Sequence, residues 1–435
     1  MMNDRSLGNP KSILRGVWSL YGAAFAMAIN LSVLWTAMPF IIRNIGGTEE
    51  HVGFVWAANM TGYVICLLVA AILLGHVNPR WTTRVSSVVM LLATGAIAIV
   101  VYCAVASDQT GSVVLVWGVI GAGALAGAAM SLFWPFLMTW VSADYEGVVL
   151  NRRLGTYNGV WSSAAIMGPL IGGALVDINT LSPVLLGVIC LAVCFLLLCL
   201  THDGSAGTAG SVGGSPVEEV ALDQTLLRRL KWMARISLFC SWVCLGVSRS
   251  QFALLFTRMG YTETQFGTIV TVFAICNFLV LTGAGRFGFW HSRPVFLIVA
   301  QLLLGVGLLL LIFGRTLSAF VPAFVIMGSG FGFAYSSHLY YGACGSKKRS
   351  VQMAIHEVTI SLGVIVGSGA GGYLAGNLGV YVPYWFAIGV LGLGLVAQGI
   401  VWIAMRGSLR GEAGFGGMTD KSKTCGRTKK RVYGY

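Results

Sequence analysis

Long apolar stretches alternate with short polar segments along the whole chain. Each stretch holds close to the ~20 apolar residues that an α-helix needs to cross the hydrocarbon core of a bilayer. The pattern therefore predicts an all-α membrane protein with twelve transmembrane helices. The predicted spans are Trp18–Ile42, His51–His76, Val85–Ala106, Val113–Met138, Leu154–Val176, Ser182–Leu200, Arg235–Phe256, Thr264–Gly285, Pro294–Gly314, Ala319–Gly342, Met353–Gly376 and Tyr381–Met405.

The composition indicates that lipid is the solvent for most of the surface. Hydrophobic residues make up 56% of the 435 residues, charged residues make up only 10%, and the mean hydropathy is +0.80. Soluble globular proteins contain about 25% charged residues. A water-soluble fold of this size would leave too much apolar surface in contact with water.

The net charge of +13 is distributed in a way that argues against a nucleic-acid partner. Basic residues are spread over every second segment between the predicted helices and over both tails, and the exceptions are Arg43, Arg249, Arg258 and Arg315. Basic loops remain on the cytoplasmic side of a membrane. We therefore expect a multi-pass protein of the cell membrane (inner or plasma membrane) with both termini in the cytoplasm. The first apolar stretch is too long for a signal peptide, so we expect it to remain as the first helix.

No motif for metal, cofactor or catalytic chemistry stands out. The ten cysteines lie mostly inside apolar stretches, without the spacing of a zinc site. We predict no cofactor and no metal. The chain also lacks the GxxxxGK[ST] loop of an ATP-driven pump, and it has neither paired histidine boxes nor an aspartyl dyad. The sequence thus argues against an ATP-driven pump and against an intramembrane enzyme.

The helices fall into two sets of six, separated by the longest loop. The end of this loop, Leu222–Ala234, combines leucines with basic residues and predicts an amphipathic helix lying on the inner leaflet. We expect the basic, Gly-rich C-terminal tail to be disordered. The predicted organisation is a cytoplasmic tail over 1–17, a six-helix bundle over 18–200, a linker over 201–234, a second bundle over 235–405 and the basic tail over 406–435.

The fifth and eleventh helices carry an internal repeat. Shifting the chain by 199 residues aligns Gly168, Gly172 and Gly173 with Gly367, Gly371 and Gly372, and it places Asn158 opposite Glu357. Such correspondence between halves is typical of transporters built by duplication. Small residues four apart also allow helix backbones to approach closely in lipid. The glycines therefore serve close packing, a sliding contact between helices, or both.

These features together resemble the major facilitator superfamily (MFS) of secondary transporters. In the fifth helix, Gly155 followed by Gly168, Pro169, Gly172 and Gly173 is similar to the family's motif C, with Ala164 replacing its middle glycine. In the loop after the second helix, Gly75, Arg80 and Arg84 match the family's motif A. Pro79 occupies the position of the motif's aspartate, which puts the cytoplasmic gate of the family in question here.

The resemblance implies two pseudo-symmetric six-helix bundles that rock around a central site, the MFS fold. It implies alternating access for a small-molecule substrate by a protein that we expect to be a monomer. The first, fourth, seventh and tenth helices would line the cavity. Motif C is associated mainly with antiporters that export their substrates. We therefore expect a secondary active transporter that favours efflux.

Ionisable residues inside the membrane are functional candidates, because burying a charge in lipid is costly. Glu357, His338 and His356 lie toward the inner side, and we regard them as candidates for binding the coupling proton. Glu357 and His338 lie at similar depth, so they are expected to be able to pair. A purely structural pair near the inner mouth is the alternative. Arg249 lies deep in the seventh helix, where it would bind an anionic substrate, act in gating, or pair structurally.

Polar amides and aromatic rings in the predicted helices suit an organic solute of moderate size. The cavity candidates are Asn30, Asn59, Trp134, Asn158, Trp161, Asn277 and Tyr335, together with Arg249. Aromatic residues near helix ends also serve as interfacial anchors. The leading interpretation is a proton-coupled exporter. Two alternatives stay open: a proton-coupled importer of an organic anion, and a transporter-like sensor without turnover.

Overall fold

A computed structural model describes residues 10–73, 77–106, 112–142, 147–201, 224–344 and 349–413. Within these residues the chain forms twelve α-helices and no strand, and each helix is long and apolar enough to cross a membrane. The predicted all-α fold with twelve spans is confirmed. The helices are α1 (Pro10–Asn44), α2 (Glu49–Leu73), α3 (Pro79–Ala106), α4 (Val113–Ser142), α5 (Gly147–Ile178), α6 (Ser182–Leu200), α7 (Gln224–Arg258), α8 (Glu263–Arg286), α9 (Val295–Phe313), α10 (Leu317–Ala343), α11 (Arg349–Leu378) and α12 (Val382–Ala413).

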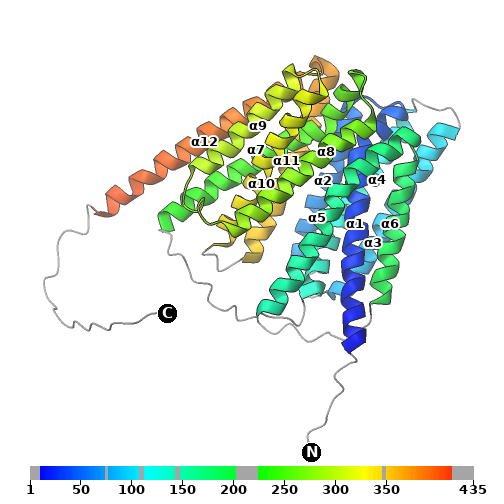
Figure 1. Cartoon of the computed structure of the whole chain (residues 1–435), viewed down its shortest axis with the longest axis horizontal. Helices are drawn as coiled ribbons and strands as arrows, with labels where there is room; N and C mark the ends of the chain where they lie inside the picture. The colour runs from blue at the N-terminus through cyan, green and yellow to red at the C-terminus, as the bar shows by residue number, and fades with distance from the viewer. Residues whose placement is uncertain are drawn as a thin grey trace, which may run out of the picture.

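The twelve helices form two bundles of six. Helices α1 to α6 pack on one another, as do α7 to α12, and the bundles meet mainly where α2 packs on α11 and α5 packs on α8. Figure 1 shows the first bundle in blue to green and the second in green to orange. An even number of antiparallel spans places the start of α1 and the end of α12 at the same end of the molecule, which we call the proximal end. The opposite end, where α1 leads into α2, is the distal end.

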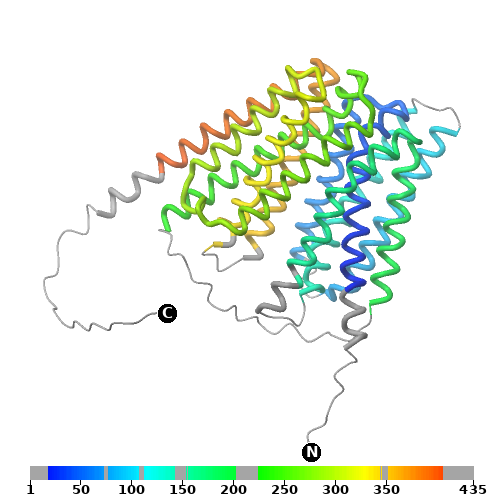
Figure 2. The backbone as a smooth tube through the Cα atoms, viewed as in Figure 1, coloured from blue at the N-terminus to red at the C-terminus, as the bar shows by residue number. Residues whose placement is uncertain are grey.

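The bundles converge at the distal end and diverge toward the proximal end (Figure 2). Their contacts explain the internal repeat. A side chain at Gly168 would collide with Ser32 of α1, and one at Gly367 would collide with Val243 of α7. Farther along the same two helices, Gly173 contacts the start of α8, and its counterpart Gly372 contacts the start of α2. Equivalent glycines thus serve equivalent contacts within each bundle and between bundles.

The start of α7 corrects one sequence-based prediction. Leu222–Ala234 was expected to hold a separate amphipathic helix on the membrane surface, but α7 runs without interruption from Gln224 to Arg258. Its apolar side is covered by protein, because Leu230 and Met233 pack in a buried cluster with Trp290, Leu297 and Tyr341. The apolar stripe of this segment therefore reflects a packed helix extension.

Several predicted boundaries fall near or beyond the described residues. The predicted tail over 406–435 begins inside α12, which extends to Ala413. The first tail, over 1–17, overlaps the start of α1 at Pro10. Residues 202–223 of the linker, residues 414–435 of the C-terminal tail and Gly75 of the motif A-like loop lie outside the described residues.

Candidate transport site

The distal end is closed by polar contacts between the bundles. The guanidinium of Arg258 on α7 forms an ion pair with Glu49 on α2, and the amide of Asn377 on α11 donates a hydrogen bond to Glu50. At the other interface, the Asp177 carboxylate of α5 accepts hydrogen bonds from the backbone N–H groups of Glu263 and Thr264, 3.2 and 3.1 Å away. Those groups belong to the N-terminus of α8, where the helix dipole favours a negative charge.

Glu357 lies where α11 meets α2, deeper than these distal contacts. The Tyr63 hydroxyl of α2 donates a hydrogen bond to Glu357 Oε2 at 3.0 Å. Tyr63 is buried, whereas Glu357 retains partial exposure. Within the described residues no other Asp or Glu lies in the interior of a helix, since the remaining helical acids lie near helix ends. An ionisable group placed between two bundles inside a membrane is costly, which makes Glu357 a functional candidate.

The two histidines pair with each other. His338 Nδ1 of α10 and His356 Nδ1 of α11 lie 2.8 Å apart, so one ring donates to the other. Both side chains are buried. Within the described residues, no hydrogen bond joins His338 to Glu357, so the pairing considered from sequence is not formed here. His356 and Glu357 are neighbours in the chain but point to different helices, as their ~100° separation around α11 requires.

Aromatic rings of α4 and α5 face the second bundle across this region. Trp134 packs against Tyr157 and Trp161 with ring centroids 6.5 and 6.4 Å apart, and Trp161 Nε1 donates to Asn158 Oδ1 at 3.2 Å. The Tyr157 hydroxyl lies near that of Tyr335 on α10, which in turn lies near the Glu357 carboxyl group. The structure therefore brings together four predicted cavity residues and Glu357, with tyrosines from both bundles between them.

Arg249 occupies a different level of the molecule. Its guanidinium lies 5.6 Å from the ring centroid of Phe273 on α8, and the side chain is partly exposed. Within the described residues it makes no hydrogen bond or ion pair. The packing of α7 along α11 places Arg249 several turns distal to Glu357, because Gly371 packs near Val247 and Gly363 packs near Trp242. Arg249 and Glu357 therefore lie at separate levels of the molecule.

Three of the four asparagines predicted to line the cavity lie at helix contacts within one bundle. Asn30 faces Gly187 of α6, Asn59 donates to the Gly123 carbonyl of α4 at 2.8 Å, and Asn277 lies against Gly332 of α10. For Asn30 and Asn277 a glycine on the neighbouring helix makes room for the amide. Asn158 is the exposed member of the set.

The motif residues lie at helix contacts. Arg84 donates two hydrogen bonds to the Leu198 carbonyl of α6, at 3.2 and 3.0 Å, and both Arg80 and Arg84 lie over the Trp140 ring. In the motif C-like segment, Gly168 and Gly172 contact α1, while Pro169 and Gly173 contact α8. Gly155 has open space around it.

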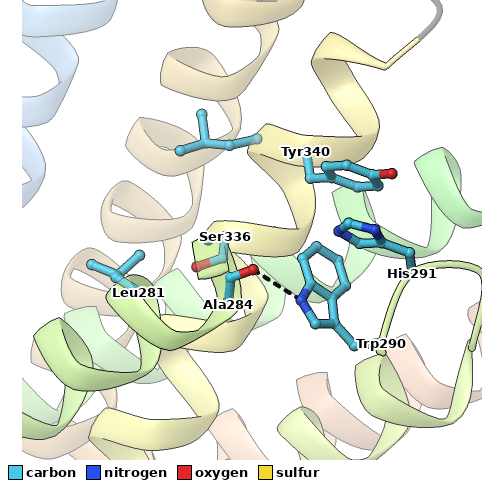
Figure 3. A pocket seen from close by; sticks show the side chains of 8 residues that line it. Leu281, Ala284, Trp290, His291, Ser336 and Tyr340 are labelled. Carbon is cyan, nitrogen blue, oxygen red and sulfur yellow. Dashed lines mark hydrogen bonds between the residues drawn. The ribbon is translucent and has the colours of Figure 1, made fainter. Parts of the chain in front are cut away.

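A cavity of about 330 Å³ lies at the proximal end of the second bundle, between α8, α10 and the loop that joins α8 to α9 (Figure 3). The His291 ring stacks on Tyr340 with centroids 3.9 Å apart, and Trp290 Nε1 donates to the Ala284 carbonyl at 3.0 Å. Burial lowers the pKa of His291 below its usual value, so the ring stacks in its neutral form. This cavity is separate from the region around Glu357.

Two site residues were missed from the sequence. Tyr63 and Tyr157 sit among apolar neighbours, and nothing in their spacing distinguishes them from interfacial tyrosines. Tyr63 could have been found by placing α2 against α11, as the internal repeat allows, and then asking which α2 residue lies level with Glu357. Tyr157 could have been found from its position beside Asn158, which the repeat already aligns with Glu357.

Two six-helix bundles that meet along paired helices, with polar and aromatic side chains between them, define a membrane transporter. The sequence profile described as Major Facilitator Superfamily matches residues 20–343. The chain belongs to this superfamily, as its motifs predicted.

Comparisons with individual proteins extend this assignment. One segment is 30% identical over 131 residues to "Multidrug resistance protein 2" of Bacillus subtilis (strain 168), covering 30% of this chain and 32% of that protein. Another match, to "Multidrug transporter protein MdtP" of the same organism, is 25% identical over 155 residues and covers 36% of this chain and 26% of that protein. The chain thus spans about a third or less of the length of these curated relatives.

Solved structures share the fold over almost the whole length. A bacterial homologue of the iron transporter ferroportin, in an inward-facing state, superposes with a TM-score of 0.69 at 14% identity, covering 90% of this chain and 99% of that one. The nucleoside transporter NupG gives a TM-score of 0.67 at 13% identity, covering 90% and 98%. At these identities the likeness concerns the fold alone.

Proposed function

We propose that this transporter is a proton-coupled antiporter that exports a small organic solute by alternating access. Glu357 carries the coupling proton, and substrate binds beside it among Trp134, Trp161 and Tyr335. The observation that carries the proposal is the single carboxyl group in a helix interior, hydrogen-bonded across the two bundles and partly exposed. A group that alternates between water and the bundle interface can exchange protons with each side in turn.

The direction of transport rests on two supports. The motif C-like segment is of the kind associated with antiporters, and two partial relatives are named as multidrug proteins. With basic loops at the proximal end, that end faces the cytoplasm of the cell membrane. The arrangement, closed distally, is then the one that loads substrate from inside. The protein works as a monomer with lipid around it, and the two bundles correspond to residues 18–200 and 235–405.

The histidine pair has a supporting role in this proposal. His338 and His356 are joined to the Glu357 region through Tyr335, whose ring lies 4.7 Å from that of His356. Lys231 and Arg235 of α7 act electrostatically on His338 from the proximal side. His356 directly precedes Glu357 on α11, so the pair lies at nearly the same depth as the coupling carboxyl group, where it can exchange protons with it.

Proton flux driven by solutes tests the proposal directly. Purified protein is reconstituted in liposomes that contain a pH-sensitive dye, and a panel of lipophilic cations, organic anions and neutral solutes is added in turn. We expect at least one solute to move protons in wild type and none to do so in Glu357→Gln. Proton flux that persists unchanged in Glu357→Gln would rule out this residue as the coupling site.

Arg249 favours a second candidate function, import of an organic anion. Its guanidinium has no hydrogen-bonding or ionic partner among the described residues and is partly exposed, so it is available to a carboxylate or phosphate. Arg249→Lys should then weaken anion binding at least tenfold, because lysine lacks the bidentate fork. A panel in which only non-anionic solutes move protons would exclude this function. Solutes that raise thermal stability yet drive no flux at all would indicate a sensor.

A further inference from the structure

We propose that Tyr63 is the residue through which the charge of Glu357 controls contact between the bundles. The inference rests on the proposed function of Glu357 and adds a partner from the opposite bundle. The hydrogen bond from Tyr63 keeps α2 packed on α11 while Glu357 is ionised. The bond weakens when a proton or a cationic substrate neutralises the carboxylate.

The position of the bond supports this role. Among the described residues, Tyr63–Glu357 is the interbundle hydrogen bond nearest the proximal end. Tyr63 lies fourteen residues along α2 from Glu49, which forms the distal ion pair, or about 21 Å at 1.5 Å per residue. In the other interface the innermost bond, from the Thr271 hydroxyl to the Ile166 carbonyl at 3.2 Å, lies only eight residues along α8 from Glu263. The Tyr63 bond therefore marks the boundary between joined and separated bundles.

The surroundings leave Tyr63 as the donor that Glu357 depends on. On α10, Tyr335 and His338 lie nearby, but Tyr335 acts on Glu357 only electrostatically and His338 is occupied by His356. On α7, Arg235 donates to Gln352 at 2.9 Å and acts on His338, as does Lys231. On α5, Tyr157 reaches the group only through Tyr335. Of all these side chains within the described residues, only that of Tyr63 hydrogen-bonds to the carboxylate.

The chemistry of this bond makes it sensitive to charge. A hydrogen bond to an ionised acceptor is about twice as strong as one between neutral groups. Separation of α2 from α11 would strip an ionised Glu357 of its donor inside a low-dielectric region, which is costly. A neutral Glu357 loses far less on separation. An empty, ionised site is therefore held in the distally closed state, and either a proton or a cationic substrate releases it.

The test measures the conformational equilibrium without substrate. Hydrogen–deuterium exchange is followed by mass spectrometry in peptides from the distal halves of α2 and α8, at an alkaline and an acidic pH. The proteins compared are wild type, Tyr63→Phe, Glu357→Gln and the double variant. Tyr21→Phe is the matched control, because Tyr21 is similarly buried and its hydroxyl donates to the Arg153 carbonyl within one bundle.

At alkaline pH, Tyr63→Phe and Glu357→Gln should each speed distal exchange about tenfold over wild type, and the double variant should exchange no faster than either. At acidic pH the differences from wild type should shrink, because wild-type Glu357 is then neutral. Tyr21→Phe should match wild type throughout.

Two results would overturn the inference. One is a Tyr63→Phe protein that exchanges like wild type at both pH values. The other is a Tyr21→Phe protein that exchanges as fast as Tyr63→Phe, which would indicate general loosening. The proton flux of Glu357→Gln is measured separately. If that variant loses proton coupling while Tyr63→Phe shows wild-type hydrogen exchange, this inference is wrong and the proposed function still holds.

Discussion

The two interfaces between the bundles share one plan and differ in one place. Gly53 of α2 packs on Ser368 of α11, and Gly267 of α8 packs on Pro169 of α5, so the two glycines hold equivalent positions. Ten residues beyond each glycine, α2 carries Tyr63 and α8 carries Asn277. On the partner helices, Glu357 and Asn158 are also equivalent. Of these two equivalent pairs, Tyr63–Glu357 is hydrogen-bonded across the bundles and Asn277–Asn158 is not, within the described residues.

The difference indicates how a duplicated fold divides its tasks. At the α5/α8 interface the corresponding amides turn away, Asn158 to Trp161 and Asn277 to Gly332, so neither of the two equivalent positions carries an acid. The described acids of this interface, Asp177 and Glu263, lie at the distal start of α8, where the Asp177 carboxylate accepts the backbone N–H groups of Glu263 and Thr264. We therefore propose that the α2/α11 interface responds to protons through Glu357, whereas the α5/α8 interface, whose described acids lie at its distal end, provides the contact about which the bundles move.

The largest effect on the distally closed state should come from replacing glycine by alanine at close backbone contacts in the two interfaces. A β-carbon at Gly53 would collide with the Ser368 carbonyl, and one at Gly173 would collide with the Glu263 carbonyl. Overpacking costs about 1–3 kcal/mol, so Gly53→Ala and Gly173→Ala should each reduce the distally closed population by about fivefold or more. Transport assays together with distal hydrogen exchange measure this. Gly155→Ala, which meets open space, is the control and should behave as wild type.

A smaller effect is expected from Asp177→Ala. The carboxylate accepts backbone hydrogen bonds at the start of α8, and loss of a helix cap costs about 0.5–2 kcal/mol. The variant should close less completely, with transport reduced severalfold, while the number of protons moved per solute stays the same. A changed proton stoichiometry in this variant would show that both interfaces take part in coupling, contrary to the comparison.

The smallest effect concerns the loops at the proximal end. Arg80 and Arg84 cover Trp140 in the first bundle, while neutral His291 covers Tyr340 in the second. Because burial lowers the pKa of His291, the unfolded or opened loop binds a proton more readily, and loop stability should fall as pH drops below about 6.5. After correction for the slower intrinsic amide exchange at low pH, exchange in the α8–α9 loop should rise at acidic pH in wild type and stay level in His291→Phe. Equal rises in both proteins would contradict this assignment.

The fold was predictable because lipid imposes simple rules. Span lengths follow from bilayer thickness, and the glycines of α5 and α11 reveal the duplication without any structure. The same rules missed the continuation of α7, because an amphipathic stripe looks the same whether lipid or Trp290 covers it. Composition does not identify the neighbour of a helix face.

The site was only partly predictable for a related reason. The rarity of charge inside a membrane singled out Glu357, Arg249 and His338, and each lies in a distinct environment. The free-energy cost of placing a polar group in lipid also singled out the asparagines. Asn30, Asn59 and Asn277 nevertheless lie at helix contacts inside one bundle. An amide inside a helix can therefore lie at a contact within one bundle instead of in the cavity. A tyrosine is common in membrane helices, so Tyr63 does not stand out in the sequence. Its position beside Glu357 in the structure identifies it as part of the site.

Solute accumulation against a gradient tests the central claim most directly. Proteoliposomes with an imposed proton gradient are supplied with a solute that drives proton flux, and accumulation is compared with gradient-free exchange of labelled solute. The account predicts that Glu357→Gln abolishes accumulation but still exchanges solute, and that Asp177→Ala accumulates it at a reduced rate. Undiminished accumulation by Glu357→Gln would contradict the assignment of proton coupling to the α2/α11 interface.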